Sequence, residues 1–170
     1  PRNPIVVFAE KSVDVLQVFM GSVYAGCFYV LIDPSFPIQR IQQILGVLSP
    51  SIVVTTQEHK DKLDESGYAG RTIMMADIPS DLNEEILESI RKQSIDTDPL
   101  YGIFTSGSTG VPKGVVICHR SVIDFIDNFT EIFGITDKDV MGNQAPFDFD
   151  VSVKDIYSCL KTGEIGRAHV

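Results

Sequence analysis

The sequence predicts an α/β domain in which a mostly parallel sheet is layered with helices. Short runs of β-branched and aromatic residues alternate with segments of helical apolar spacing, separated by Gly, Pro or Asp. The composition of the 170 residues, 44% hydrophobic and 22% charged, is typical of a globular domain. A chain of this length buries about 70% of the surface that its unfolded form exposes. Without an internal repeat or a long linker, the chain is predicted to be one domain or part of one.

The first predicted elements are a strand, a helix and a second strand. Residues 5–8 form a short β-branched run, and residues 28–32 form another that stops at an Asp-Pro pair. Between them, residues 12–25 carry closely spaced apolar side chains, which predicts a mostly buried helix. Ser12 is a suitable N-cap, and Gly26 stands where a left-handed residue commonly ends a helix.

The middle of the chain continues this alternation. Two predicted strands, over residues 51–55 and 71–75, flank a charged helix near residues 58–65. An amphipathic helix over residues 83–92 follows them. A further helix begins at Pro37, and its apolar stripe consists of Ile38, Ile41, Ile44, Leu45 and Leu48.

The last part of the chain places a loop between two more strands. A buried strand is predicted over residues 100–104 and a second strand over residues 114–117, with a Gly-rich loop between them. A helix over residues 121–133 comes next. Another helix follows Asp150, with the stripe Val153, Ile156, Tyr157 and Leu160.

The charge and the cysteines exclude some classes of function. With 14 Lys and Arg against 23 Asp and Glu, the net charge is −9, which argues against nucleic acid or an anionic membrane surface as a partner. The sequence holds neither a spanning apolar stretch nor a signal peptide. Cys27, Cys118 and Cys159 form no C-x-x-C pair, which favours free thiols and no metal site. We therefore expect a cytoplasmic protein.

The loop after residues 100–104 carries the strongest functional signal. Every side chain from Thr105 to Gly110 is a hydroxyl or a hydrogen, and Lys113 adds a cation. Hydroxyls donate to phosphate oxygens and glycines let backbone N–H groups approach, so the loop is suited to a polyphosphate. Pro112 stands where a Gly-x-x-x-x-Gly-Lys pattern counted from Gly107 requires glycine, and no Gly-x-Gly-x-x-Gly occurs here. The alternative is a flexible Ser/Gly surface loop.

Three segments together resemble the adenylate-forming enzyme superfamily. Residues 105–115, TSGSTGVPKGV, are similar to its phosphate-loop signature. Residues 24–37 resemble the AGxxYVPxDPxxPxxRI segment of amino-acid adenylation domains, with Leu31 where that family usually has proline. Residues 143–157, NQAPFDFDVSVKDIY, resemble the segment that anchors the substrate amine. The resemblance covers nearly all of residues 4–163 and implies a partial N-terminal domain of such an enzyme.

The resemblance implies an ATP-dependent, Mg²⁺-assisted activation of an amino acid, followed by transfer to a phosphopantetheine carrier protein. Lys113 is a phosphate contact or, alternatively, a structural lysine outside the closed site. The family's adenine-binding segment, magnesium-holding acid and catalytic lysine map beyond Gly163, so the chain alone is expected to be inactive. The residues that the resemblance assigns to ATP are Thr105, Ser106, Gly107, Ser108, Thr109, Gly110 and Lys113.

Asp150 carries the prediction about the substrate. By resemblance, it binds the α-ammonium group of an amino acid, and a carboxylate in a partly desolvated pocket needs such a cation. The alternative is a helix N-cap, and both roles can coexist. Asp148 aligns with a more variable position and is expected to be solvated or capping.

The segment over residues 143–157 is most similar to that of D-alanine–carrier protein ligases, so D-alanine is the predicted amino acid. A module of a non-ribosomal peptide synthetase is the main alternative. An acyl-CoA ligase is disfavoured because it has no substrate amine for Asp150 to hold. A non-catalytic nucleotide-binding module is disfavoured by the intact loop.

His119 follows the strand over residues 114–117 and is a conceivable general base. No Asp or Cys stands at a triad-like spacing from it. We therefore expect it to occupy the start of a helix.

The two ends of the chain look incomplete. Pro1 is not an initiator Met and lies close to the first strand. Residues 164–170, EIGRAHV, lack helical spacing and turn residues, and they match the translation of a common sequencing adapter. We expect residues 1–163 to be a partial adenylation domain and residues 164–170 to be a non-native read-through tail. A natural polar terminus is the alternative.

Overall fold

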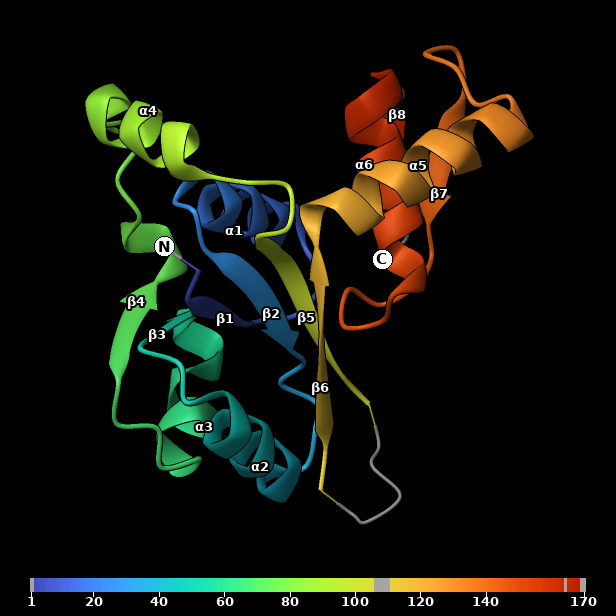
Figure 1. Cartoon of the computed structure of the whole chain (residues 1–170). Helices are drawn as coiled ribbons and strands as arrows, with labels where there is room; N and C mark the ends of the chain where they lie inside the picture. The colour runs from blue at the N-terminus through green and yellow to red at the C-terminus, as the bar shows by residue number, and fades with distance from the viewer. Residues whose placement is uncertain (1, 106–110, 164, 169–170) are drawn as a thin grey trace.

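The computed structural model describes residues 2–105, 111–163 and 165–168 (Figure 1). In this part of the chain, the main sheet has the strand order β4-β3-β1-β2-β5-β6. All neighbouring strands are parallel except β5 and β6, which form an antiparallel pair at one edge. The predicted α/β class with a mostly parallel sheet is therefore confirmed. The strands are β1 (Pro4–Phe8), β2 (Phe28–Ile32), β3 (Ile52–Thr55), β4 (Arg71–Met74), β5 (Pro99–Thr105) and β6 (Lys113–Cys118).

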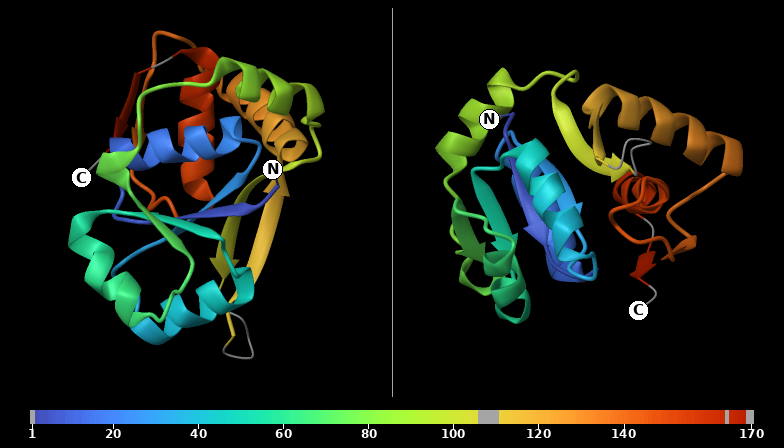
Figure 2. Two further views of the ribbon diagram at one scale, coloured as in Figure 1. Left: turned by 90° about the vertical axis from the view of Figure 1, so that its left-hand side faces the viewer. Right: turned by 90° about the horizontal axis from the view of Figure 1, so that it is seen from below.

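Helices cover both faces of this sheet. Figure 2 (left) shows α1 on one side and α2 with α3 on the other. Side chains alternate along β1, so Val7 packs in the core cluster that holds Phe19 of α1, while Val6 and Phe8 pack in the cluster that holds Ile41 of α2. The central strands are thus buried on both faces, as in most parallel sheets, whereas the edge strand β6 is mostly exposed. The helices here are α1 (Val13–Tyr24), α2 (Ile38–Leu48), α3 (Lys60–Glu65) and α4 (Glu84–Gln93).

The predicted helix ends of α1 are confirmed. The Ser12 hydroxyl accepts a hydrogen bond from the backbone N–H of Val15 at 3.3 Å, and Gly26 has a φ of 69°. The charged helix predicted near residues 58–65 divides into a 3₁₀ turn, η1 (Gln57–His59), and α3. Leu31 lies in register with Val7 inside the central strand β2, so leucine in place of proline leaves the ladder intact.

A second lobe lies beside the edge of the sheet that β5 and β6 form, at the upper right of Figure 1. It contains α5 (His119–Phe133), α6 (Val151–Thr162) and a small parallel pair, β7 (Val140–Asn143) with β8 (Ile165–Ala168). In the following text, "second lobe" means these four elements and their connections. The helix α5 begins at His119 rather than at residue 121, because Cys118 already takes the extended N-cap conformation.

Residues 165–168 form a strand that pairs with β7, although this segment has neither helical spacing nor turn residues. Ile165 to Ala168 are in register with Val140 to Asn143. Their pairing depends on backbone hydrogen bonds between distant segments, which helical spacing and turn residues do not reveal. The proposed non-native origin of residues 164–170 stays a prediction. None of the helices in the described ranges is long and apolar enough to cross a membrane.

Candidate functional site

The hydroxyl-rich loop connects the antiparallel strands β5 and β6. Thr105 and Lys113 are the last paired residues of this hairpin, and both are exposed. The threonine hydroxyl and the lysine amine therefore lie opposite each other at the base of the loop. Ser106, Gly107, Ser108, Thr109 and Gly110 lie outside the described residues.

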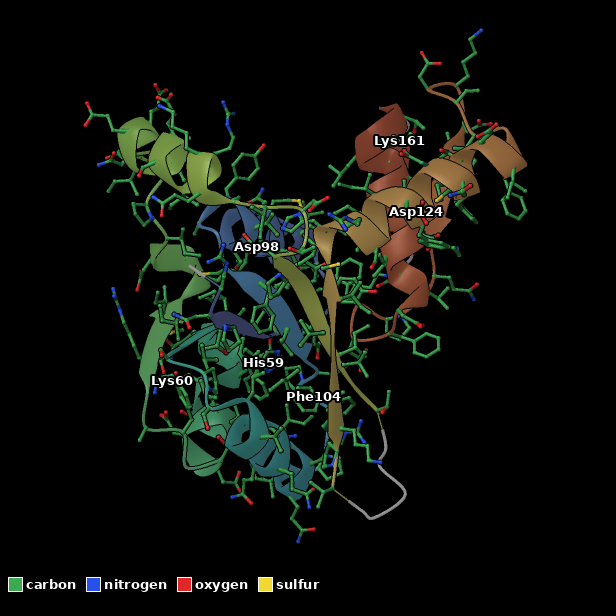
Figure 3. The ribbon with its side chains drawn as sticks, viewed as in Figure 1. His59, Lys60, Asp98, Phe104, Asp124 and Lys161 are labelled. Atoms are coloured by element: carbon green, nitrogen blue, oxygen red, sulfur yellow. The ribbon has the colours of Figure 1, made fainter. Side chains whose placement is uncertain are left out.

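Gly114 allows the two strands to close tightly next to this loop. It is in register with Phe104, and a Cβ atom on Gly114 would lie 3.1 Å from the Cζ atom of the Phe104 ring. Figure 3 labels Phe104 near the end of β5, where the sheet leads toward the loop. The glycine thus leaves room for a ring that packs against the α2 side of the core. Gly114, the glycine of the segment Pro112-Lys113-Gly114, therefore has a packing role.

A second cation lies beside the same end of β5. Arg40 of α2 donates from Nη2 to the carbonyl oxygen of Phe104 at 3.4 Å, and its guanidinium lies 4.7 Å from the centre of the Phe36 ring. Its Nε atom is buried and has no hydrogen-bond partner among the residues that the structure describes. Sequence reasoning included this arginine in a motif but assigned it no role. The available signal was its place after the Asp-Pro turn that ends β2.

A pocket of about 310 Å³ lies between the sheet and the second lobe. Tyr101 of β5 and Ile117 of β6 form its floor with residues of α5, while residues of α6 form another wall. Such a volume falls at the lower end of small-molecule sites. The residues that line it from the two helices and the preceding turn are Ser121, Val122, Phe125, Asp150, Val151, Val153 and Lys154.

Asp150 is part of this pocket wall. It occupies the N-cap position of α6 with helical φ and ψ of −59° and −26°, and its side chain makes no capping hydrogen bond. The side chain therefore does not cap the helix in this conformation. Asp150 is exposed rather than partly desolvated as predicted, so its carboxylate is open to solvent or to a ligand. Burial raises the pKa of Tyr101, and the negative charge of Asp150 raises it further. The structure thus brings this predicted site residue close to Tyr101 of β5.

Asp148 is more buried than expected. Its side chain is half-buried, and burial raises its pKa above the ordinary value. The nearby charge of Asp33 raises that pKa as well, while Arg40 lowers it. Asp148 therefore faces the Arg40 end of the sheet rather than open solvent.

Two tyrosines fasten α6 to the sheet next to the pocket. The hydroxyl groups of Tyr29 in β2 and Tyr157 in α6 are 3.2 Å apart and share a hydrogen bond. Burial raises the pKa of Tyr157 to about 12, so the hydroxyl stays protonated at neutral pH. This contact fixes the helix that follows Asp150.

His119 is the first residue of α5, as expected. Its backbone N–H donates to the carbonyl oxygen of Asp98 at 3.1 Å, and burial lowers the pKa of its side chain. The histidine does not line the pocket that holds Asp150. The structure therefore gives it a local structural role at the helix start.

Among the residues that the structure describes, no group of three or more His, Cys, Asp or Glu side chains is arranged to hold a metal ion.

The fold and the site define an α/β domain with a hydroxyl-rich connection between β5 and β6 and a pocket lined by Tyr101, Ile117 and Asp150. Residues 1–164 match the family model for the AMP-binding enzyme. The chain belongs to this family, which confirms the resemblance to adenylate-forming enzymes.

The similar curated proteins include D-alanine--D-alanyl carrier protein ligases of Staphylococcus aureus. Those of strains JH9 and Mu50 are each 37% identical to this chain over 163 residues, which are 95% of this chain and 32% of each relative. The chain thus spans about a third of the length of these relatives. Among solved structures, the nonribosomal peptide synthetase FmoA3 (S1046A) matches with a TM-score of 0.84 and 26% identity, over 99% of this chain and 17% of that chain.

A second solved structure supports the fold alone. The four-domain nonribosomal peptide synthetase holo-AB3403, solved with AMP and glycine, matches with a TM-score of 0.79. It is 23% identical and covers 96% of this chain and 12% of that one. The arrangement of sheet and second lobe is therefore shared by proteins of low sequence identity.

Proposed function

We propose that this chain is part of a ligase that uses ATP to activate an amino acid and then loads it onto a phosphopantetheine carrier protein. The observation that carries the proposal is Asp150, whose carboxylate lines the pocket and makes no capping hydrogen bond. Its motif and the 37% identity to proteins named D-alanine--D-alanyl carrier protein ligase favour D-alanine as the amino acid.

In the first half-reaction, a carboxylate oxygen of the amino acid attacks the α-phosphorus of ATP. The bond from that phosphorus to the bridging oxygen breaks, pyrophosphate leaves with the electron pair, and an aminoacyl-adenylate remains. Catalysis of such a step rests mainly on positioning and charge neutralisation. The hairpin supports this role because the Thr105 hydroxyl and the Lys113 amine are at the base of the loop. The proposed triphosphate contacts are Thr105, Ser106, Gly107, Ser108, Thr109, Gly110 and Lys113.

In this proposal, Asp150 binds the α-ammonium group of the substrate. A carboxylate and an ammonium form short, charge-assisted hydrogen bonds that strengthen as water leaves the pocket. Asp150 is exposed in this chain, so the strength of the pair depends on how far the bound substrate excludes water. Once such a pair is buried, removal of one partner leaves an uncompensated charge and costs about 3–5 kcal/mol. An acyl-CoA ligase has no such cation to bind, so Asp150 argues against that function.

In the second half-reaction, the thiol of the carrier's phosphopantetheine arm attacks the acyl carbon. The thiol proton is lost, the bond from the acyl carbon to the phosphate oxygen breaks, and AMP leaves. ATP would bring Mg²⁺, whose protein ligands we expect outside the described residues. A module of a peptide synthetase is the second candidate, supported by the TM-score of 0.84 to FmoA3.

Amino-acid-dependent exchange of pyrophosphate into ATP tests this function in the full-length protein that carries the chain. We expect exchange with D-alanine, and we expect Asp150→Ala to lower kcat/KM for the amino acid by at least about 100-fold. Asp14→Ala, which removes an exposed acid from the first turn of α1, is the matched control and should leave exchange unchanged. The proposal would be contradicted if the wild-type protein showed no exchange with any amino acid tested, or if Asp150→Ala kept full activity.

A further inference from the structure

The connection between β7 and α6 needs support from outside, because its own hydrogen bonds are few. This connection, taken to include Asn143 at the end of β7, spans residues 143–150 and ends at Asp150. Within it, the backbone N–H of Phe149 donates to the Pro146 carbonyl at 3.2 Å, and at its end the Ser152 hydroxyl donates to the Phe149 carbonyl at 2.8 Å. These bonds shape the last turn before α6 but do not attach the connection to the main sheet.

Lys11 supplies that attachment from a distant part of the sequence. It lies in the turn between β1 and α1, and its Nζ donates to the carbonyl oxygens of Asn143 at 2.7 Å and Ala145 at 3.0 Å. The same ammonium lies 5.1 Å from the centre of the Phe147 ring. One side chain therefore holds three points of the connection that leads to Asp150.

The surroundings of Lys11 make these contacts costly to lose. Phe147 is 5% exposed and packs on Phe19 of α1, with 5.9 Å between ring centres. Asp155 of α6 is 3% exposed and accepts from Asn143 Nδ2 at 3.0 Å, and it pairs with the Lys154 ammonium. Burial lowers the pKa of Lys11, while the charge of Asp155 raises it. Without Lys11, two carbonyls lose their donor and a buried carboxylate loses part of its compensation.

We propose that Lys11 is a positioning residue for amino-acid binding: it fixes the connection over residues 143–147 to the main sheet and thereby places Asp150 in the pocket. This inference rests on the proposed function. It assigns Lys11 no contact with the substrate, the nucleotide or the carrier protein. Because Lys11 acts through Asp150, its loss should weaken binding of the amino acid and not of ATP.

Steady-state pyrophosphate exchange in the full-length protein tests this inference through a comparison of two KM values. For Lys11→Met, which keeps the apolar stem and removes the donors, we expect KM for the amino acid to rise by about tenfold, since small misplacements of binding groups are costly. KM for ATP should stay within about twofold of wild type. Lys11→Arg keeps a cation and several donors and should restore most of the affinity.

Lys62→Met is a matched control. Lys62 of α3 also donates to a backbone carbonyl, that of Pro34, and lies away from the pocket. Its removal should leave KM for the amino acid unchanged. A merely structural role for Lys11 predicts instead that Lys11→Met lowers thermal stability and raises the two KM values together.

A double-mutant cycle gives the sharpest test. In an Asp150→Ala background, Lys11→Met should change KM for the amino acid by less than about twofold, because the group that it positions is gone. A full tenfold effect in that background, or equal effects on both KM values, would overturn the inference. If Lys11→Met does not fold, Lys11→Gln replaces it with an expected rise of about threefold, and a wild-type KM for that variant overturns the inference as well. Absence of wild-type exchange would instead defeat the proposed function itself.

Discussion

The main sheet and the second lobe of this molecule differ in how completely their apolar side chains are buried. In β2 all five residues are buried, and Val6, Val7 and Phe8 of β1 are fully covered by helices on both faces. In the second lobe, α5 leaves Ile132 76% exposed and Phe133 68% exposed. The lobe is joined to the sheet by apolar contacts, because Val122, Ile126 and Val153 belong to the core cluster on the α1 side, and by polar contacts from Lys11 and between Tyr29 and Tyr157. We infer from the difference in burial that the sheet supplies most of the folding stability.

The largest expected effect comes from a change to the sheet core. Phe8 is fully buried in the α2-side cluster, so Phe8→Ala should lower the free energy of unfolding by about 3–5 kcal/mol. Phe133→Ala in α5 removes the same side chain from an exposed position and should change it by no more than about 0.5 kcal/mol. Denaturant titration of both variants measures the contrast, and equal effects would remove the distinction between the two regions.

A medium effect is expected where the sheet meets the loop. Gly114→Ala places a Cβ atom 3.1 Å from the Phe104 ring, which should cost about 1–3 kcal/mol of unfolding free energy. Gly21→Ala in α1 meets no atom within 4 Å and should stabilise by about 0.5–1 kcal/mol, because alanine favours helix. The midpoint temperature of thermal unfolding should therefore fall for Gly114→Ala and rise for Gly21→Ala. A shift in the same direction would show that the close approach at Phe104 does not constrain the hairpin.

The smallest expected effect concerns pH and Asp148. Burial raises the pKa of this carboxyl group in the folded chain, so its ionisation opposes folding. Below the ordinary pKa of aspartate, the carboxyl group is protonated and its contribution to the free energy of unfolding is fully present. This contribution is lost as the pH rises through the raised pKa of Asp148 in the folded chain. Asp148→Asn should therefore raise the unfolding free energy at pH 7, by less than about 1 kcal/mol because the group is only half-buried, and change it little at pH 3.

Unfolding curves at pH 3 and pH 7 check this sign. Asp61→Asn in α3, an exposed acid without a resolved ion pair in the described structure, provides the reference at both values. If Asp148→Asn raised the free energy of unfolding more at pH 3 than at pH 7, the direction of the pKa shift would be contradicted.

Local sequence patterns were sufficient for most of the fold. The β-branched runs at β1, β2 and β3 and the Ser12 and Gly26 signals of α1 identified their elements within a residue or so. The pair β7–β8 was missed because Val140–Asn143 contains glycine and asparagine, and its partner lies more than twenty residues later. The antiparallel direction of β6 likewise depends on how the hairpin closes, which composition does not determine.

The candidate site could be predicted only in part. A motif identified Asp150, and the structure places it in a pocket wall with Tyr101 and Lys154. The contacts of Lys11 with Asn143 and Ala145 join residues more than 130 positions apart, so no local pattern contains them. The roles predicted for Ser106 to Gly110 remain predictions.

Discrimination between D-alanine and propionate tests the central claim most directly. The two acids differ at the α-carbon by the ammonium group that Asp150 is proposed to bind. In the full-length wild-type protein, kcat/KM for pyrophosphate exchange should favour D-alanine by at least about 100-fold, and Asp150→Ala should reduce this preference to less than about tenfold. An unchanged preference in Asp150→Ala would show that another group recognises the amine, and would contradict the account.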